Sequence, residues 1–259
     1  MKNLVIGDSS QLAQYFCKNS CKIISSRNLP FNDLMKIKWE KIFLCFAEQR
    51  TFIENDDEIF CKVNVQYTLE IIKKLVLCSK KIIVYSTAEL WNKIDKPTIN
   101  LSDSFIYDKT PYIESKKKLY DLVKSDSYMS KKVLFMFPVN FNSIYRKPGS
   151  LFGKIFDSIK NKKKISIGDT YFYRDLVHPK FVVKKSLEAN TDLIIGSGRL
   201  TFVNDFIRDL YHFSNMNYED FVEENNIFSL NTKRNIYYLN SPKVLYSYQE
   251  LLEDTLKEL

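Results

Sequence analysis

The sequence predicts an α/β fold in which a doubly wound parallel sheet is joined to a small C-terminal lobe. Two observations predict it. Short apolar runs suited to buried strands alternate with helical segments up to Phe137, and the first apolar run ends in a turn that begins with Gly7. At 259 residues the chain is long enough to bury a full core and to carry an appended lobe.

The expected elements follow one another as βαβ units. Strands are expected at residues 4–6, 22–24, 41–46, 81–85 and 132–137, and helices at 11–17, 64–77 and 111–124. Beyond about Ser150 the alternation is looser, and glycines become more frequent there. We therefore expect a sheet domain over residues 1–150. A lobe over residues 151–259 should be interleaved with the last strands of the sheet.

Composition argues against several classes of protein. The net charge is +8, but the lysine excess accompanies abundant Asn, Ile, Tyr and Phe, as AT-rich coding would produce. The densest basic run, at 160–164, is more typical of a solvated helix end than of a phosphate-binding track, so we expect no nucleic-acid partner. No apolar run approaches the roughly 20 residues that a membrane span needs. We expect no membrane association.

Cysteine usage and the first residues indicate a cytoplasmic protein. The five cysteines are scattered, and only two histidines accompany them, so we expect reduced thiols and no metal site. A strand begins almost at Met1, which leaves no room for a signal peptide.

The turn after the first strand has the sequence GDSSQLA, from Gly7 to Ala13. Dinucleotide-binding folds place small residues here so that backbone amides at the helix start can approach the pyrophosphate. Gly7 supplies the tight turn, whereas Ser10 and Ala13 stand where the second and third small residues are usual. We predict a nicotinamide dinucleotide at this turn. Its expected contacts are Gly7, Ser9, Ser10, Gln11 and Leu12.

The end of the second strand bears on the choice between NADP and NAD. An acidic residue there would hold the ribose 2′-hydroxyl and repel a 2′-phosphate. This chain instead has hydroxyls and an arginine, including Ser26 and Arg27. A guanidinium donates paired hydrogen bonds to phosphate, so we expect NADP, with NAD as the alternative. Arg27 could also be a stray residue of a polar turn.

Two motifs place a hydroxyl, a phenol and an ammonium where one carbonyl could meet all three. Val84 to Ala88 reads VYSTA, and Pro111 to Lys116 reads PYIESK. Lys116 lies four residues after Tyr112, on the same helix face, and its charge favours the phenolate. Thr87 can hold the substrate oxygen by a hydrogen bond. These groups suit hydride transfer between a nicotinamide and a carbinol carbon.

The spacing from tyrosine to lysine is not specific by itself. It occurs three times, at Tyr112/Lys116, Tyr120/Lys124 and Tyr128/Lys132. Only the first pair has a preceding proline, a serine just before the lysine, and the upstream Ser-Thr-Ala sequence. Tyr112 is therefore the candidate proton donor, and the other two pairs are expected to be solvated helix residues.

Taken in order along the chain, these motifs resemble the extended short-chain dehydrogenase/reductase family of sugar-nucleotide epimerases, dehydratases and reductases. Ser10 to Ala13 is similar to the Gly-Gln-Leu-Gly turn of dTDP-4-dehydrorhamnose reductases, and Phe43 to Glu48 resembles the family's strand beside the cofactor. The other matching segments are Asn64 to Thr68 for Asn-Val-x-Gly-Thr, Phe137 to Asn140 for Arg-Pro-x-Asn, and Tyr173 to His178 for Arg-Asp-Phe-Val-His.

The resemblance implies a Rossmann fold and roles for individual residues. The implied catalytic tetrad is Asn64, Thr87, Tyr112 and Lys116. Further implied cofactor contacts are Ala47, Tyr112, Lys116 and Pro138, and implied substrate contacts are Thr87, Glu89, Asn140 and Arg174. Arg174 would meet the nucleotide diphosphate, and the alternative is a salt bridge to Asp169 or Asp175.

One departure from the family pattern narrows the expected reaction. The 4,6-dehydratases have Thr-Asp-Glu where this chain has Thr87, Ala88 and Glu89, so the acid that protonates a departing hydroxyl is absent. Glu89 could act as a base at a neighbouring carbon, or could be a solvated loop carboxylate.

The resulting hypothesis is an NADP-linked reductase of a keto-sugar in surface-polysaccharide synthesis, and the resemblance implies that this sugar is nucleotide-linked. The first alternative is an epimerase that retains its NAD. The second is a relative that has lost catalysis and serves as a binding subunit, which Ser10 favours and the Thr87/Tyr112/Lys116 set opposes. We expect a homodimer paired through the helices that start near Asn64 and Pro111.

Overall fold

The computed structural model describes residues 2–17, 20–49, 57–146, 149–225, 238–239, 241 and 243–259. Its contacts divide the chain into two compact units. Unit 1 comprises Met1–Ile94, Ser104–Pro138 and Val183–Ile194, and unit 2 comprises Asp95–Asp103, Val139–Val182 and Ile195–Leu259. Residue 150, where a change of domain was predicted, falls inside unit 2, and the chain later returns to unit 1.

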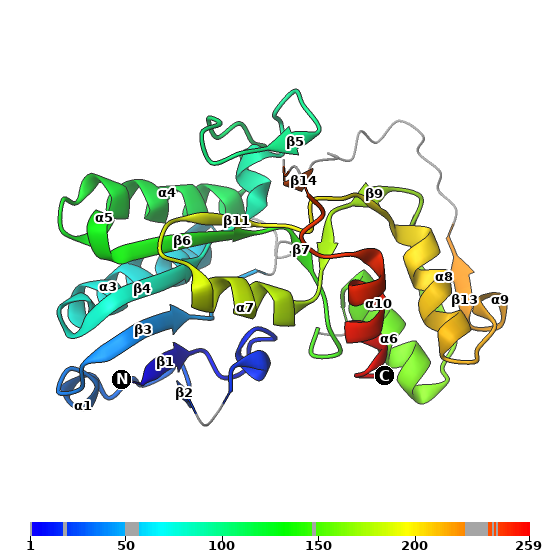
Figure 1. Ribbon diagram of the computed structural model, residues 1–259, viewed down its shortest axis with the longest axis horizontal. Helices are drawn as coiled ribbons and strands as arrows, with labels where there is room; N and C mark the ends of the chain where they lie inside the picture. The colour runs from blue at the N-terminus through cyan, green and yellow to red at the C-terminus, as the bar shows by residue number, and fades with distance from the viewer. Residues whose placement is uncertain are drawn as a thin grey trace. The chain divides into compact units, whose positions relative to one another are not determined.

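Unit 1 is built on a six-stranded sheet with the order β11-β6-β4-β3-β1-β2 (Figure 1). The pairs from β2 to β6 are parallel, which confirms the predicted α/β fold class. The strands are β1 (Asn3–Ile6), β2 (Cys21–Ile24), β3 (Trp39–Leu44), β4 (Ser79–Tyr85), β6 (Val133–Pro138) and β11 (Leu193–Ile195). Each predicted strand of the sheet is present, with its ends shifted by at most a few residues.

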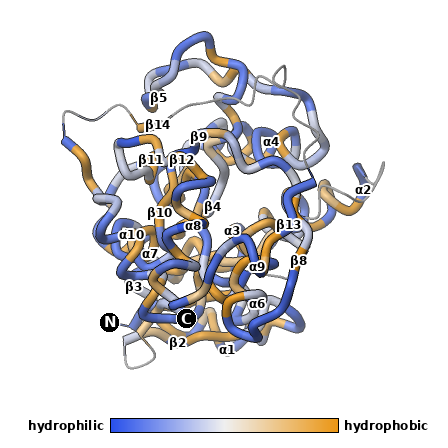
Figure 2. Tube along the Cα trace, turned by 90° about the vertical axis from the view of Figure 1, so that its right-hand side faces the viewer, coloured by the Kyte–Doolittle hydropathy of each residue, from blue (hydrophilic) through white to orange (hydrophobic). Residues whose placement is uncertain are grey.

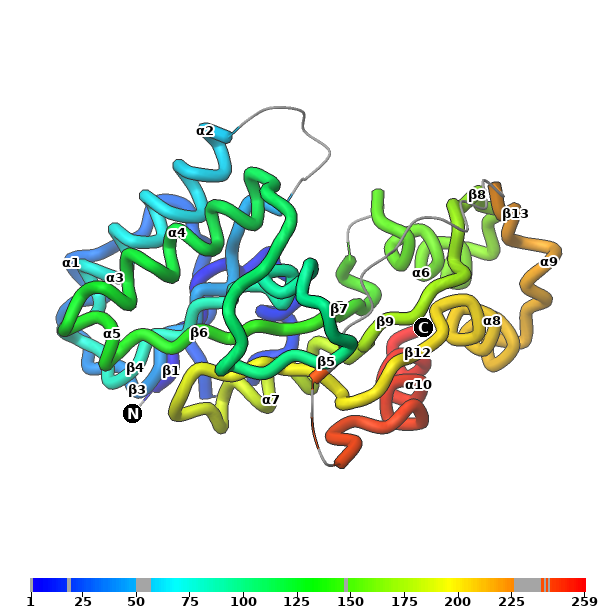
Figure 3. Tube along the Cα trace, turned by 90° about the horizontal axis from the view of Figure 1, so that it is seen from above, coloured from blue at the N-terminus to red at the C-terminus, as the bar shows by residue number. Residues whose placement is uncertain are grey.

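The strands are apolar on both faces because helices cover both sides of the sheet. Leu4, Val5 and Ile6 are consecutive and all fully buried, as are Ile82 and Ile83. A strand covered on one face only would alternate between apolar and polar residues. Figure 3 shows α3 (Thr68–Leu75) and α4 (Pro111–Ser125) on one side of the sheet and α7 (Pro179–Glu188) on the other.

The helix α4 has strong start signals in its sequence. Thr110 is extended, and its hydroxyl accepts a hydrogen bond from the Ile113 amide at 3.3 Å. Pro111 occupies the first position, where no intrahelical amide bond is lost. The predicted helix at 111–124 is therefore confirmed almost to the residue.

Two other helix predictions need correction. Residues 11–17 were expected to form a helix, but the structure has only the 3₁₀ turn η1 (Ala13–Tyr15), after which Phe16 is extended. The Ser10 hydroxyl accepts from the Ala13 amide at 3.1 Å, and this local bond closes a single turn. The helix expected from Asn64 begins earlier, as α2 (Asp57–Phe60), and continues through the π-helix η2 (Cys61–Tyr67) into α3.

The remaining short elements of unit 1 connect these parts. They are α1 (Phe31–Leu34), the 3₁₀ turns η3 (Val76–Cys78) and η4 (Ala88–Trp91), and α5 (Met129–Lys132).

Unit 2 combines amphipathic helices with two-stranded pairings. Its helices are α6 (Leu151–Asn161), α8 (Val203–Phe213), α9 (Tyr218–Phe221) and α10 (Tyr248–Leu256). The pairings are β5 (Thr98–Ile99) with β14 (Tyr238–Leu239), β7 (Asn140–Phe141) with β10 (Leu176–Val177), β8 (Ile165–Ile167) with β13 (Val222–Glu224), and β9 (Tyr173–Arg174) with β12 (Thr201–Phe202). Hydrophobic and hydrophilic stretches alternate along α6 and α8 in Figure 2, as expected for helices with one buried face.

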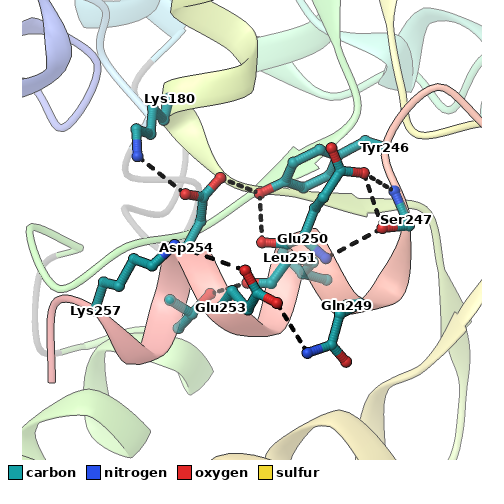
Figure 4. Close-up of polar contacts among 10 residues, drawn as sticks. Lys180, Tyr246, Ser247, Gln249, Glu250, Leu251, Glu253, Asp254 and Lys257 are labelled. Carbon is teal, nitrogen blue, oxygen red and sulfur yellow. Dashed lines mark hydrogen bonds and ion pairs between the residues drawn. The ribbon is translucent and has the colours of Figure 1, made fainter.

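The last helix, α10, is held by polar contacts at its start and along one side (Figure 4). Ser247 and Glu250 form a reciprocal capping box, which satisfies amides that the first turn leaves unpaired. Asp254 accepts hydrogen bonds from the Tyr246 hydroxyl at 2.8 Å and from the Lys180 ammonium at 3.0 Å. These contacts connect α10 to the start of α7 within unit 2.

Candidate active site

Lys116 is the buried cation of unit 1. Its side chain reaches from α4 to the end of β4, where its ammonium donates a hydrogen bond to the Tyr85 carbonyl at 2.9 Å. The same ammonium nitrogen lies 5.8 Å from the centre of the Tyr112 ring. Burial lowers the pKa of Lys116 from 10.5 to about 8, so the ammonium is mostly charged at neutral pH and loses its proton as the pH rises through about 8.

Tyr112 occupies the second position of α4 and is half-buried. Its ring packs edge-on against Phe60, with ring centres 6.3 Å apart. Tyr85, the other tyrosine near the lysine, is only 8% exposed, and burial raises the pKa of its phenol well above the usual value. Lys116 therefore lies near the ring of the half-buried Tyr112 and is bonded to the backbone carbonyl of the buried Tyr85.

Thr87 lies two residues beyond the end of β4 and caps the 3₁₀ turn η4. Its hydroxyl oxygen accepts from the Glu89 amide at 3.2 Å. This bond uses a lone pair, so the hydroxyl proton can still be donated to a carbonyl. The Glu89 carboxylate is half-exposed and accepts from the Asn92 side-chain amide at 3.4 Å.

Asn64 lies in the π-helix η2 and is 2% exposed. Its side-chain carbonyl accepts from the Glu48 amide at 2.8 Å, and its amide group donates to the Glu48 carbonyl at 3.1 Å and the Ser115 hydroxyl at 3.0 Å. Ser115 in turn donates to the Tyr112 carbonyl at 2.6 Å. Asn64 therefore fixes the loop after β3 and the first turn of α4 relative to each other.

Ser115 and Tyr85 were not among the predicted site residues, although both lie inside the two quoted motifs. In the sequence, Ser115 only distinguishes the Tyr112/Lys116 pair from the two others, and its position does not predict the hydrogen bond to Asn64. The Tyr85 contact uses a backbone carbonyl, which sequence does not distinguish from any other.

The predicted cofactor contacts from Gly7 to Ala47 follow the carboxyl ends of β1, β2 and β3, whereas Pro138 ends β6 and Tyr112 and Lys116 lie on α4. Gly7 has φ +111°, and its amide and that of Asp8 both donate to the Ile24 carbonyl, at 2.9 and 3.3 Å. A Cβ at Gly7 would lie 2.7 Å from the Cys45 carbonyl oxygen, so only glycine fits this turn.

The side chains around this turn differ in exposure. Ser9 and Arg27 are exposed, whereas Ser10, Gln11, Ser26 and Ala47 are half-buried and Leu12 and Pro138 are buried. Leu12 would therefore meet a ligand through its backbone alone. Arg27 follows the end of β2 and is bonded locally, through its amide, to the Ser25 hydroxyl at 3.2 Å.

Unit 2 contains a polar cavity of about 220 Å³. It is lined by Asn140, Asn142, Arg146, Ser150, Leu151, Phe152, Phe172, Arg174, Leu176 and Val203. Among the described residues that line it are two arginines and no carboxylates, so its electrostatic preference is for an anion. Asn140 and Arg174, predicted from separate motifs, both belong to this lining.

The two arginines of the cavity are positioned by nearby groups. The Arg174 guanidinium lies 4.8 Å from the centre of the Phe172 ring and donates to the Tyr173 carbonyl at 2.8 Å. The Arg146 guanidinium donates to the Ser150 hydroxyl at 3.4 Å. Asp175, a proposed alternative partner of Arg174, is buried and accepts instead from the Ser197 amide and hydroxyl at 2.8 and 2.7 Å.

Within the described residues, no group of three or more His, Cys, Asp or Glu side chains is arranged to hold a metal ion. No helix in that part of the chain combines the length and apolar character needed to cross a membrane.

No protein-family model and no curated protein matches the chain. Solved structures do match it over nearly their whole length. UDP-N-acetylglucosamine 4-epimerase from Methanobrevibacter ruminantium, solved with UDP-N-acetylmuramic acid, has a TM-score of 0.77 at 15% identity over 99% of this chain and 97% of its own. RMD from Pseudomonas aeruginosa, solved with NADPH, has a TM-score of 0.76 at 12% identity over 99% of both chains. UDP-glucose 4-epimerase from Thermotoga maritima, solved with UDP-glucose, has a TM-score of 0.74 at 17% identity over 100% of this chain and 98% of its own.

The chain has the same Rossmann-like α/β fold as these solved structures. The resemblance inferred from the motifs is thereby confirmed at the level of fold. This fold also explains why the predicted residues that follow β1, β2 and β3 lie together. Its parallel strands end at one edge of the sheet, and ligands of such sheets bind at that edge.

Proposed function

We propose that the protein is a nicotinamide-dependent enzyme that reduces a keto group of a nucleotide-linked sugar. The observation that carries the proposal is the placement of Lys116, a buried ammonium at the end of β4, 5.8 Å from the ring of the half-exposed Tyr112. An ammonium near a phenol stabilises the phenolate, and this makes the phenol a suitable proton donor near neutral pH. Solved structures of the same fold, with UDP-glucose and NAD or with NADPH, support the choice of cofactor and substrate class.

In this proposal the residues of unit 1 perform the chemistry. A nicotinamide dinucleotide, held by the residues of the turn from Gly7 to Leu12, would supply the hydride for the carbonyl carbon. Thr87 donates a hydrogen bond to the carbonyl oxygen and orients it, and Tyr112 transfers its phenolic proton to that oxygen, which yields the carbinol. The positive charge of Lys116 stabilises the phenolate that remains until a proton from water restores the phenol. Asn64 positions the turn that carries Tyr112.

The cavity of unit 2 is proposed to hold the nucleotide diphosphate of the substrate. Arg174 and Arg146 supply guanidinium donors for phosphate oxygens, and Phe172 supplies an aromatic face. Asn140 adds amide donors and acceptors. We also propose that the enzyme is cytoplasmic, serves surface-polysaccharide synthesis and forms a homodimer through α3 and α4. The exposed side chains of these helices include Lys73, Lys118 and Asp121. In a dimer formed through these helices, the lysines of one subunit would therefore have to lie opposite acidic side chains of the other.

The proposed function is tested by finding which cofactor copurifies with the protein and which reaction the protein catalyses. The purified protein should contain no bound nicotinamide and should oxidise NADPH in the presence of nucleotide-linked 4-keto-sugars. NAD that remains bound through purification, together with interconversion of two sugar epimers without net oxidation, would identify the alternative epimerase instead. A protein that binds no nicotinamide nucleotide at all would contradict both readings and favour a binding subunit.

The choice of NADP rests on Arg27, which is exposed just beyond β2. Arg27→Ala should weaken NADPH binding by about 1–3 kcal/mol, the scale of a charge-assisted contact, and leave NADH binding nearly unchanged. Titration calorimetry of both cofactors measures the difference, with Lys22→Ala on β2 as a control for the loss of one positive charge. Equal weakening of NADPH and NADH would show that Arg27 does not contact the 2′-phosphate.

The anion cavity leads to a prediction for Arg174. Arg174→Ala should raise KM far more than it lowers kcat, because a contact remote from the reacting carbon acts similarly in the ground and transition states. Lys164→Ala, which removes an exposed charge outside the cavity lining, should change neither.

Binding at the cavity can be measured without a known substrate. UDP, GDP, CDP or dTDP should raise the melting temperature of the wild type, and Arg174→Ala should reduce that shift. If none of the four nucleotides stabilises the wild type, the nucleotide-linked substrate is the wrong class. If Arg174→Ala has a lower melting temperature than the wild type, and none of the four nucleotides raises that of the wild type, then Arg174 has a structural role.

A further inference from the structure

Tyr67 stands where the Asn-Val-x-Gly-Thr motif, matched here by Asn64 to Thr68, has a glycine. It is the last residue of the π-helix η2 and is half-buried. A glycine leaves the space beside the helix open, whereas a tyrosine fills it. The effect of having a tyrosine in place of this glycine therefore depends on the direction in which the ring points.

Two contacts define the position of the Tyr67 side chain. Its ring lies against Phe46, with ring centres 5.7 Å apart. Its hydroxyl donates a hydrogen bond to the Ser26 carbonyl. Phe46 comes two residues after β3, and Ser26 comes two residues after β2.

The sheet register shows what lies between these two contacts. Ile6, the last residue of β1, pairs with Ile24 on one side and with Leu44 on the other, so the three strands end level with one another. Because β1 lies between β2 and β3, a side chain that touches the residues following both must pass across the end of β1. The turn that begins there is the one at Gly7.

This is the path that a dinucleotide takes in folds of this kind. The pyrophosphate lies over the glycine turn, and the adenosine ribose lies at the end of the second strand. The usual order of such sheets has a third strand beyond the second, whereas β2 is the outermost strand of this sheet as the structure describes it. The ring of Tyr67, between Phe46 and Ser26, therefore lies where the adenosine half of a dinucleotide would bind.

We propose that Tyr67 is a gate over the adenosine half of the dinucleotide site, closed by its hydrogen bond to Ser26. This inference rests on the proposed function, and it deepens it. The cofactor can occupy the site only when the phenol leaves the Ser26 carbonyl and the ring leaves Phe46. The apparent affinity for any adenosine-containing ligand is then reduced by the fraction of molecules in which the gate is closed.

The gate has a chemical requirement that the site meets. The hydroxyl must be protonated to donate to a carbonyl. Burial, and secondarily the charge of Glu70, raises the pKa of Tyr67, so it remains a donor at neutral pH. The bond joins two neutral groups, and the net contribution of such a bond to stability is modest. The free energy of ligand binding is therefore enough to break it, and no other partner is needed to open the gate.

The test uses two fragments of the cofactor. ADP-ribose contains the adenosine half, and nicotinamide mononucleotide lacks it. Tyr67→Ala should bind ADP-ribose about threefold to tenfold more tightly than the wild type, as expected for the loss of one hydrogen bond and a competing ring. Tyr67→Phe removes only the hydroxyl, preserves the packing, and should give a smaller gain of the same sign. Neither change should alter the affinity for nicotinamide mononucleotide.

The control is Tyr128→Ala, which removes an exposed tyrosine elsewhere in unit 1 and should leave both affinities unchanged. The gate would be overturned if the two Tyr67 variants bound ADP-ribose no better than a wild type that does bind it, because the ring would then be a support for the adenosine. If neither the wild type nor any variant bound ADP-ribose or nicotinamide mononucleotide, the proposed function itself would fail, and the gate with it. Binding of ADP-ribose by the variants alone would support the gate.

Discussion

Tyr112→Phe is expected to lower turnover by at least about 100-fold, the scale of losing a general acid, while leaving cofactor affinity nearly unchanged. The substitution removes only the phenolic hydroxyl. The ring keeps its packing against Phe60, and the chain of bonds from Asn64 through Ser115 ends on the Tyr112 backbone carbonyl, which the substitution leaves intact. The measurement is the rate of NADPH oxidation with a substrate that the wild type reduces, together with a calorimetric titration of the cofactor.

The chain offers two matched controls for this experiment. Tyr120 and Tyr128 also precede a lysine by four residues. Tyr120 packs among Phe105, Phe135 and Phe137, and Tyr128 is exposed. Their substitution by phenylalanine should leave turnover within about twofold of the wild type. A Tyr112→Phe enzyme that retained more than a tenth of the activity would show that another group supplies the proton.

Gly7→Ala is expected to destabilise the protein by about 2–4 kcal/mol, from strained backbone and steric overlap together. Gly7 has φ +111°, where an L-residue is strained, and its new Cβ would lie 2.7 Å from the Cys45 carbonyl oxygen and 3.1 Å from the Phe46 Cβ. Because Cys45 directly follows β3, relief would require moving backbone beside the central strands. Urea unfolding followed by circular dichroism measures the loss of stability.

Gly168→Ala is the comparison for this effect. An added Cβ at Gly168 meets no atom within 4 Å, so its cost should be within about 0.5 kcal/mol. If the two variants unfolded at the same urea concentration, the backbone at Gly7 would not be confined as the structure shows. Since Gly7 also begins the proposed cofactor turn, its variant should lose NADPH affinity as well, whereas Gly168→Ala should not.

The central strands were predictable because each one is a short apolar run buried on both faces. Phe43 and Ile83 need only be apolar and β-prone to take their places, and the shortness and the β-branched and aromatic content of such runs separate them from helices. The start of α4 was predictable for a different reason, because Thr110 and Pro111 act on their own helix. The helix expected at 11–17 failed because Ser10 competes for a backbone amide, an interaction that helical periodicity does not include.

By itself, the sequence determined the strands β1, β2, β3, β4 and β6, the helix α4, the glycine at the first turn, and the candidates Thr87, Tyr112 and Lys116. Each of these depends on residues close together in the chain, where spacing and residue type carry the information. Tertiary structure alone decided that Lys116 bonds to the Tyr85 carbonyl and that Tyr67 reaches Ser26 across the end of β1. Those contacts join residues 31 and 41 positions apart. The first depends on where α4 lies beside the end of β4, and the second on the parallel pairing that brings the ends of β1, β2 and β3 level.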